Sequence, residues 1–274
     1  MSKQVVLITG ASSGMGKVTA EKLLSKGYVV YAAARRLDKM EDLKKLGAKT
    51  VKLDVSKEDQ VEALVDQIIS DQGRIDVLFN NAGFGLYGAV EDVSLSDARY
   101  QFDVNVFGLA KMTQTVLPHM RKQGRGKIIM TSSMGGKIYT PLGAWYHATK
   151  HAVEGFSDCL RLEVEGFGID VVVVEPGIIL TDFGNVVADG PVMKNSGKGA
   201  YSAMAQQVAS ATARSYEGQT GSSPELIANT VLKAIEARKP KTRYLVGYLA
   251  KPLVIMRRLL GDRLFDRVIM SQVK

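Results

Sequence analysis

The chain has 274 residues, of which 46% are hydrophobic, a length and composition that fit one soluble α/β domain with a sizeable core. Its single cysteine, Cys159, excludes an intramolecular disulfide and favours a reducing, cytoplasmic compartment. The net charge of +8 is concentrated in residues 233–274, which hold 11 basic and 3 acidic residues, and a charge confined to one end excludes a broad nucleic-acid-binding face.

The start of the chain predicts no targeting segment. Met1 leads into a strand-like run by Gln4, which leaves no room for a signal peptide. No apolar run reaches the ~20 residues that a membrane-spanning helix needs. We therefore expect a cytoplasmic protein.

Apolar runs alternate with helical patterns along most of the chain. The runs that predict buried strands span residues 4–8, 28–34, 50–53, 77–79, 127–131 and 171–174. Helical patterns separate them, the first ending at Gly27 and the others covering residues 37–46, 57–72, 95–122 (with a break near Val104–Asn105) and 144–167. Strands that are apolar on both faces belong in a parallel sheet covered by helices on both sides. We predict a doubly wound, Rossmann-type three-layer α/β fold with a seven-stranded parallel sheet, which binds ligands at the carboxyl ends of its strands.

No linker or repeat divides the chain, so residues 1–274 are expected to form a single dinucleotide-binding domain with the catalytic site built in. Residues 184–223 are rich in Gly, Ser and Ala and interrupt the alternation, so residues 178–223 are expected to form a substrate loop or lid. Residues 240–274 form a basic C-terminal extension. The side chains that favour an apolar substrate pocket in the predicted loop are Ile178, Ile179, Leu180, Phe183, Val186 and Val187.

The first strand runs into a glycine-rich turn, Thr9-Gly-Ala-Ser-Ser-Gly-Met-Gly16, that opens a helix. Glycines allow a tight turn and let the backbone approach a pyrophosphate, and the helix N-terminus offers free N–H groups. The spacing Gly-x-x-x-Gly-x-Gly also fits an ordinary turn, but the strand–turn–helix context favours a dinucleotide site. The predicted phosphate-binding residues are Gly10, Ser12, Ser13, Gly14, Met15 and Gly16.

The end of the second strand determines which dinucleotide is preferred. An acidic residue there would bond the ribose 2′-hydroxyl and repel a 2′-phosphate, but this chain has Ala34, Arg35 and Arg36. A guanidinium matches phosphate oxygens and stays charged, so the pair predicts NADP(H) with a preference of roughly tens- to hundreds-fold. The alternative is a solvated basic pair at a helix start.

Tyr146 and Lys150 lie four residues apart, so one helical face carries both. A tyrosine ordinarily titrates near pH ~10, and a neighbouring ammonium stabilises the phenolate that general acid–base catalysis requires. Ser133 follows a strand whose carboxyl end lies on the same rim as the glycine turn, where its hydroxyl would hold a substrate oxygen. Taken alone, Tyr-x-x-x-Lys is a common surface pair, so the prediction depends on the combination.

These motifs occur in an order and spacing that resemble the single-domain branch of the short-chain dehydrogenase/reductase family. The resemblance covers residues 4 to about 181 and includes the glycine turn, Asp54-Val55, Asn80-Asn81-Ala82-Gly83, Asn105, Ser133, Tyr146-x-x-x-Lys150 and Pro176-Gly177-x-x-x-Thr181. Residues 251–270 also look similar to the tails of hydroxysteroid- and retinol-dehydrogenase-like members. The resemblance implies an NADP-dependent oxidoreductase that acts on CH–OH groups and assembles as a homodimer or homotetramer through helices near residues 105–122 and 146–166.

The family's roles carry over residue by residue. By resemblance, Tyr146 exchanges a proton with the reacting oxygen, Lys150 favours its phenolate and bonds the nicotinamide ribose, Ser133 orients the substrate, and Asn105 holds a water in the proton path. The remaining implied cofactor contacts are Asp54 and Val55 at the adenine, Asn81, Ala82 and Gly83 on the adenosine side, Pro176 and Gly177, and Ile179 and Thr181 at the carboxamide. Many NADP-dependent members carry a basic residue where this chain has Ser13, so the NADP preference rests on Arg35, with Arg36 as a second candidate.

The C-terminal residues 251–270 interleave apolar side chains with arginine. They are expected either to pack over the substrate cleft or a subunit contact, or to attach weakly to an anionic membrane surface. His147 and His151 have a metal-ligand spacing but no evident third ligand, so no metal site is expected. Cys159 is expected to be a buried helix residue.

The sequence therefore predicts hydride transfer between NADP(H) and a carbonyl or secondary alcohol of a lipid-, steroid- or retinoid-like substrate. One alternative is a 3-oxoacyl-carrier reductase, which a basic docking patch near the cleft would support. The other is a non-catalytic NADP-binding sensor, against which the intact Asn105, Ser133, Tyr146 and Lys150 argue.

Overall fold

A seven-stranded parallel sheet forms the middle layer of the computed structural model, which describes residues 3–181, 190–217 and 220–272. The strand order is β3-β2-β1-β4-β5-β6-β7, and every neighbouring pair is parallel. The strands are β1 (Val5–Thr9), β2 (Val29–Ala34), β3 (Lys49–Lys52), β4 (Val77–Asn80), β5 (Gly126–Thr131), β6 (Ile169–Pro176) and β7 (Arg243–Val246). The predicted doubly wound fold is confirmed, and the order reverses between β1 and β4, where such folds bind ligands.

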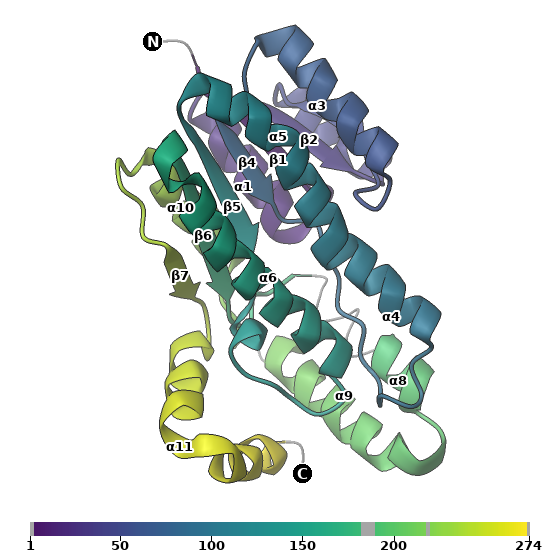
Figure 1. The fold of residues 1–274 in the computed structure, drawn as a ribbon. Helices are drawn as coiled ribbons and strands as arrows, with labels where there is room; N and C mark the ends of the chain where they lie inside the picture. Colours follow the sequence, from purple (N-terminus) through teal and green to yellow (C-terminus); the bar gives the residue numbers. More distant parts are fainter. Residues whose placement is uncertain (1–2, 182–189, 218–219, 273–274) are drawn as a thin grey trace.

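Helices cover both faces of the sheet (Figure 1). One face packs against α3 (Glu58–Gln72), α5 (Leu109–Gln123) and α6 (Ala144–Val164). The other packs against α1 (Gly14–Ser25), α2 (Glu41–Lys45) and α10 (Pro224–Glu236). Successive strand residues point to opposite faces, so Leu7 joins the first core and Ile8 the second. This double burial explains why the strand sequences are apolar throughout.

The break predicted near Val104–Asn105 is a short π-helix, Asp103–Gly108, between α4 (Leu95–Phe102) and α5. π-Helical turns are frequent at functional sites because they displace backbone groups from the regular helical pattern. A Cβ on Gly108 would lie 2.6 Å from the Val55 carbonyl oxygen, so the helix passes very close to the end of β3. The buried Asn105 lies in this π-turn.

The segment expected to be a substrate loop is largely helical where it is described. It holds α8 (Pro191–Ser196) and α9 (Ser202–Glu217), while Phe183, Val186 and Val187 lie outside the described residues. The two helices pack together on the side of the sheet's carboxyl edge (Figure 1).

The basic C-terminal extension begins inside the sheet, because it contains β7. The following helix, α11 (Ala250–Ser271), bends at Gly261 and packs Val254, Phe265 and Ile269 against Ile138. Across the described ranges, no helix combines the length and the apolar character that a membrane span requires. The expectation that Cys159 is buried was wrong: it lies on the exposed side of α6.

Candidate active site

The glycine turn is built for close backbone contact. Gly10 and Gly14 have φ values of 69° and 54°, which disfavour residues with a side chain. A Cβ on Gly10 would lie 2.8 Å from Ala82 Cα, and one on Gly16 would lie 2.5 Å from Asn81 Nδ2. Ser13 precedes α1 without capping it through its side chain, so the first N–H groups of the helix have no side-chain cap. The turn therefore has the features of a pyrophosphate cradle.

A hydrogen-bonded floor joins the ends of β1 and β4 beneath this turn. The Thr9 hydroxyl accepts hydrogen bonds from the backbone N–H groups of Asn81 and Ala82, both at 3.1 Å. Asn81 Nδ2 donates to the carbonyls of Thr9 and Gly10 at 3.1 and 3.2 Å. The Asn81 side chain therefore holds the backbone of the turn in place. Thr9 also holds this turn, although the sequence analysis did not predict it as a site residue.

The two arginines after β2 point in different directions. Arg36 Nη2 donates to the hydroxyls of Ser12 and Ser13, both at 3.3 Å. Arg35 Nη1 donates to the Tyr100 hydroxyl at 2.5 Å. The sequence analysis assigned the NADP preference mainly to Arg35, but it is Arg36 that lies beside the glycine turn.

The predicted adenine-side residues are held locally. Asp54 Oδ1 accepts from the Ser56 N–H at 3.1 Å and from its hydroxyl at 2.8 Å, which fixes the turn after β3. Val55 is buried in the core next to the π-helix. These contacts place both residues at the carboxyl edge of β3.

Asn105 is tied to the segment after β4. Its Oδ1 accepts from the Phe84 N–H at 3.0 Å, while its Nδ2 donates to the Phe84 carbonyl at 2.9 Å and to the Thr149 hydroxyl at 3.2 Å. A Cβ on Gly83 would lie 3.1 Å from Asn105 Oδ1 and 3.9 Å from Lys150 Nζ, so Gly83 lies beside both predicted catalytic residues. Nothing in the sequence pattern marked Phe84 or Thr149.

The predicted catalytic side chains come together at the carboxyl ends of β5 and β6. Tyr146 and Lys150 are both buried on α6, and Lys150 Nζ lies 5.8 Å from the centre of the Tyr146 ring. Lys150 Nζ donates to the Thr131 carbonyl at 2.9 Å. Ser133 Oγ accepts from the Gly135 N–H at 3.0 Å and donates to the Pro176 carbonyl at 3.5 Å. Burial lowers the pKa of Lys150 to about 8, against the opposing effect of Glu154.

His147 holds the segment after Ser133 against α6. The Thr140 N–H donates to His147 Nε2 at 3.1 Å, so Nε2 acts as the acceptor and Nδ1 carries the proton that bonds the Gly135 carbonyl at 2.9 Å. Burial lowers the pKa of His147, which favours this neutral form. Within residues 3–181, 190–217 and 220–272, no three potential metal ligands cluster, and His147 has a structural explanation.

The segment after β6 passes next to the glycine turn. A Cβ on Gly177 would collide with the Tyr248 carbonyl, and Ile179 pairs with Ser222. A Cβ on Gly14 would lie 3.3 Å from Thr181 Cγ2, so Thr181 faces the turn. The motif predicted to bind the pyrophosphate and the motif predicted to bind the carboxamide therefore border one site.

An apolar cluster covers the tyrosine. Tyr87 stacks on Tyr146 with ring centroids 5.6 Å apart and an interplanar angle of 29°. Asn195 Nδ2 donates to the Tyr87 carbonyl at 2.8 Å, which attaches α8 to this segment. We call the surrounding residues the lid cluster: Tyr87, Ala89, Leu142, Val192, Met193, Tyr201, Met204, Ala205 and Val208. Sequence reasoning missed Tyr87 and Leu142, because only folding brings them under the helices.

Comparisons with known proteins agree with this geometry. Residues 4–191 match the family described as short chain dehydrogenase. A Bacteroides thetaiotaomicron protein named 3-ketodihydrosphingosine reductase is 46% identical over 183 residues, which cover 67% of this chain and 66% of that protein.

Solved structures are similar over most of the chain. A short-chain dehydrogenase from Streptomyces avermitilis superposes with a TM-score of 0.81 and 31% identity, covering 94% of this chain and 93% of that one. A serine dehydrogenase in complex with NADP⁺ has a TM-score of 0.78 and 28% identity, covering 90% of this chain and 95% of that one. Because the family match ends at residue 191, the likeness to these structures extends beyond it.

Proposed function

Because the chain belongs to the short-chain dehydrogenase/reductase family, we propose that this oxidoreductase transfers a hydride between NADP(H) and the carbonyl or secondary alcohol of an apolar substrate. The observation that carries the proposal is the convergence of Tyr146, Lys150 and Ser133 beside a glycine turn of dinucleotide-binding geometry. No sensor function requires this proton-transfer arrangement.

The residues present fit a nicotinamide dinucleotide, which supplies the hydride when it is bound. In the reductive direction Tyr146 donates a proton to the substrate oxygen, and Ser133 donates a hydrogen bond to the same oxygen. Lys150 stabilises the phenolate that results. Since the Asn105 side chain is already engaged by Phe84 and Thr149, the water assigned to Asn105 belongs on its main-chain carbonyl.

NADP(H) is the proposed cofactor because the two positions directly after β2 carry guanidiniums, Arg35 and Arg36, and no carboxylate. Arg36 is already directed at the turn hydroxyls, so it is the better ligand for a 2′-phosphate. Arg35 would have to leave Tyr100 to take part. The NADP⁺ in the similar serine dehydrogenase supports this choice.

An apolar substrate is proposed because the lid cluster beside Tyr146 is formed by aromatic, aliphatic and methionine side chains. Methionines adapt to irregular apolar shapes, which suits a flexible lipid-like chain. The relative named 3-ketodihydrosphingosine reductase adds support for a ketone with a long apolar part.

The test is NADPH oxidation measured against ketones and aldehydes from short polar compounds to steroid-sized ones. We expect turnover with the larger apolar ketones, and a loss of about 10²–10⁴-fold in kcat in Tyr146→Phe with NADPH affinity retained. NADPH binding without turnover across the panel would contradict the proposed reaction and favour the sensor.

We also propose a homodimer or homotetramer in the cytoplasm. Phe107, beside α5, and Leu162, on α6, are 62% and 69% exposed, as expected for helices that meet a second copy. Size-exclusion chromatography with light scattering should therefore show an oligomer that Phe107→Asp weakens. A reducing location is supported by the single cysteine.

A weak contact with anionic membrane is the proposed role of the outer side of α11. Leu259 is 77% exposed there, and Arg258 and Arg263 flank it. Co-sedimentation with phosphatidylserine vesicles at low salt tests this contact, and the absence of binding would refute it.

A further inference from the structure

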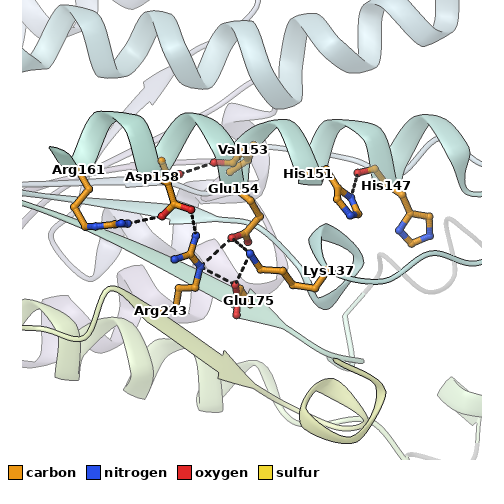
Figure 2. A network of polar contacts seen from close by, with 10 residues as sticks. Lys137, His147, His151, Val153, Glu154, Asp158, Arg161, Glu175 and Arg243 are labelled. Atoms are coloured by element: carbon orange, nitrogen blue, oxygen red, sulfur yellow. Dashed lines mark hydrogen bonds and ion pairs between the residues drawn. The ribbon is translucent and has the colours of Figure 1, made fainter. Parts of the chain in front are cut away.

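Two buried carboxylates, Glu154 on α6 and Glu175 on β6, share the partly buried cations Lys137 and Arg243 in one cluster of side chains (Figure 2). Glu154 and Glu175 are only 5% and 3% exposed. Lys137 Nζ lies 2.7 Å from Glu154 Oε2 and 3.7 Å from Glu175 Oε1. Arg243 Nε lies 3.1 and 3.2 Å from the same two oxygens. Burying two carboxylates side by side carries a large desolvation and repulsion free energy. The two shared cations offset this free energy.

Each of these four residues belongs to a segment next to a catalytic element. Lys137 follows the 3₁₀ turn Met134–Gly136, which Ser133 caps. Glu154 lies one helical turn after Lys150 on α6, and Glu175 directly precedes Pro176. Arg243 opens β7, the neighbour of β6. The group therefore links the segments that carry the predicted proton-transfer residues.

The 3₁₀ turn is pressed against α6 at the same place. A Cβ on Gly136 would lie 3.0 Å from Glu154 Cγ and 3.0 Å from the Lys150 carbonyl oxygen. No side chain fits there without movement. Any displacement of Glu154 is therefore transmitted to the turn that follows Ser133.

The charge of Glu154 affects the pKa of Lys150. Burial lowers the pKa of Lys150 to about 8, and the Glu154 carboxylate works in the opposite direction by favouring the ammonium. Burial, and then the nearby Glu154, raise the pKa of Glu175 to about 7. The charge behind Lys150 thus changes close to neutral pH.

We propose that Glu154 is a positioning residue, which keeps Lys150 cationic and, together with Lys137, holds the Ser133 segment against α6. Glu175 competes with Glu154 for the same two cations and so modulates this effect. The inference rests on the proposed function and deepens it, because a carboxylate outside the substrate and cofactor sites sets the proton affinity of the Tyr146–Lys150 pair.

The other charged groups near Glu154 provide a control. On α6, Asp158 binds the same arginine, with Arg243 Nη2 at 2.6 Å from Asp158 Oδ2, and Arg161 Nη1 lies 2.5 Å from Asp158 Oδ1. His147 and His151 lie on the N-terminal side of Glu154 (Figure 2). Asp158 is one turn farther from Lys150 than Glu154 is, so Asp158→Asn removes a similar charge from the same helix at a greater distance.

The decisive measurement is the pKa of Lys150, followed by NMR on the full-length protein with isotope-labelled lysine and assigned with Lys150→Met. We expect Glu154→Gln to lower that pKa by about one pH unit and Asp158→Asn to leave it in place. The alkaline limb of the pH profile for NADPH-dependent reduction should move down with it, because removing a negative charge lowers the macroscopic pKa of the coupled Tyr146–Lys150 pair. Glu154→Asp, which retains the charge, should restore the wild-type position.

We expect Lys137→Met to shift the pKa of Lys150 in the direction opposite to Glu154→Gln. Removing this cation should raise the pKa of Lys150, whereas a purely structural role would not produce opposing shifts. An unchanged Lys150 pKa in folded Glu154→Gln overturns the inference. If Glu154→Gln does not fold, an unchanged or lowered Lys150 pKa in Lys137→Met overturns it. The NMR titration requires no turnover, so failure of the proposed reaction and failure of this inference are distinguishable.

The stability of the protein tests Glu175 separately. Its pKa is raised from 4.5 to about 7, so the folded state binds a proton more tightly than the unfolded state. Stability should therefore fall as pH rises through this range. Thermal unfolding between pH 5 and 8 should show a steeper loss of Tm in the wild type than in Glu175→Gln. Parallel slopes would overturn the role of Glu175.

Discussion

The proposed cofactor side and the proposed substrate side of the site are built from different kinds of atoms. The glycine turn is shaped mainly by backbone packing. Gly10 and Gly16 allow contacts that a Cβ would prevent, and Thr9 and Asn81 hold the turn in place through hydrogen bonds. On the substrate side, the lid cluster consists of side chains from segments far apart in the chain. A turn packed through its backbone tolerates few substitutions. The apolar side chains of the lid cluster can be exchanged for others without changing the residues proposed to transfer the proton.

The largest difference between the two sides should come from adding one methyl group to the turn. Gly16→Ala places a Cβ 2.5 Å from the Gly10 carbonyl oxygen and from Asn81 Nδ2. We expect NADPH affinity, measured by fluorescence titration, to fall about a hundredfold, roughly 3 kcal/mol.

Gly155→Ala on α6 is the matched control, because a Cβ there meets nothing within 4 Å. It should keep its NADPH affinity and gain about 0.5–1 kcal/mol in unfolding free energy. Equal affinities for the two variants would show that the turn does not bind the cofactor.

The next largest effect should separate the two arginines. Arg36→Ala should weaken NADPH binding about tenfold and leave NADH binding nearly unchanged, because only NADPH has a 2′-phosphate. Arg35→Ala should have a smaller effect, since Arg35 is engaged with Tyr100. Equal losses for NADPH and NADH would contradict the assignment.

The smallest effect is expected at the lid. Met204→Ala should raise KM for a long-chain ketone about fivefold, the loss from roughly 1 kcal/mol of apolar contact, and leave KM for a short ketone unchanged. Met270→Ala on α11, which also removes a methionine side chain, should change neither value. If both ketones respond equally to Met204→Ala, the lid cluster does not select chain length.

The same contrast explains what the sequence predicted. The sheet and the glycine turn follow from local patterns, apolar strands and positive-φ glycines, so the fold was predicted correctly and the turn residues lie together as expected. Tyr87 and Leu142 could not be predicted because their contact depends on how α8 and α9 dock. Arg35 and Arg36 are neighbours in sequence, and only the contacts of their side chains separate their roles.

Arg243 has a consequence for the order in which the molecule assembles during synthesis. The carboxylates of Glu154 and Glu175 emerge from the ribosome long before the strand that carries Arg243. This strand pairs with β6 only after residues 177–242 have been made. Until that pairing forms, the interior behind Lys150 has an excess of negative charge. The pairing of β7 with β6 is therefore a late, long-range folding step, which follows the synthesis of the first strands. It brings the Arg243 guanidinium to the carboxylates of Glu154 and Glu175.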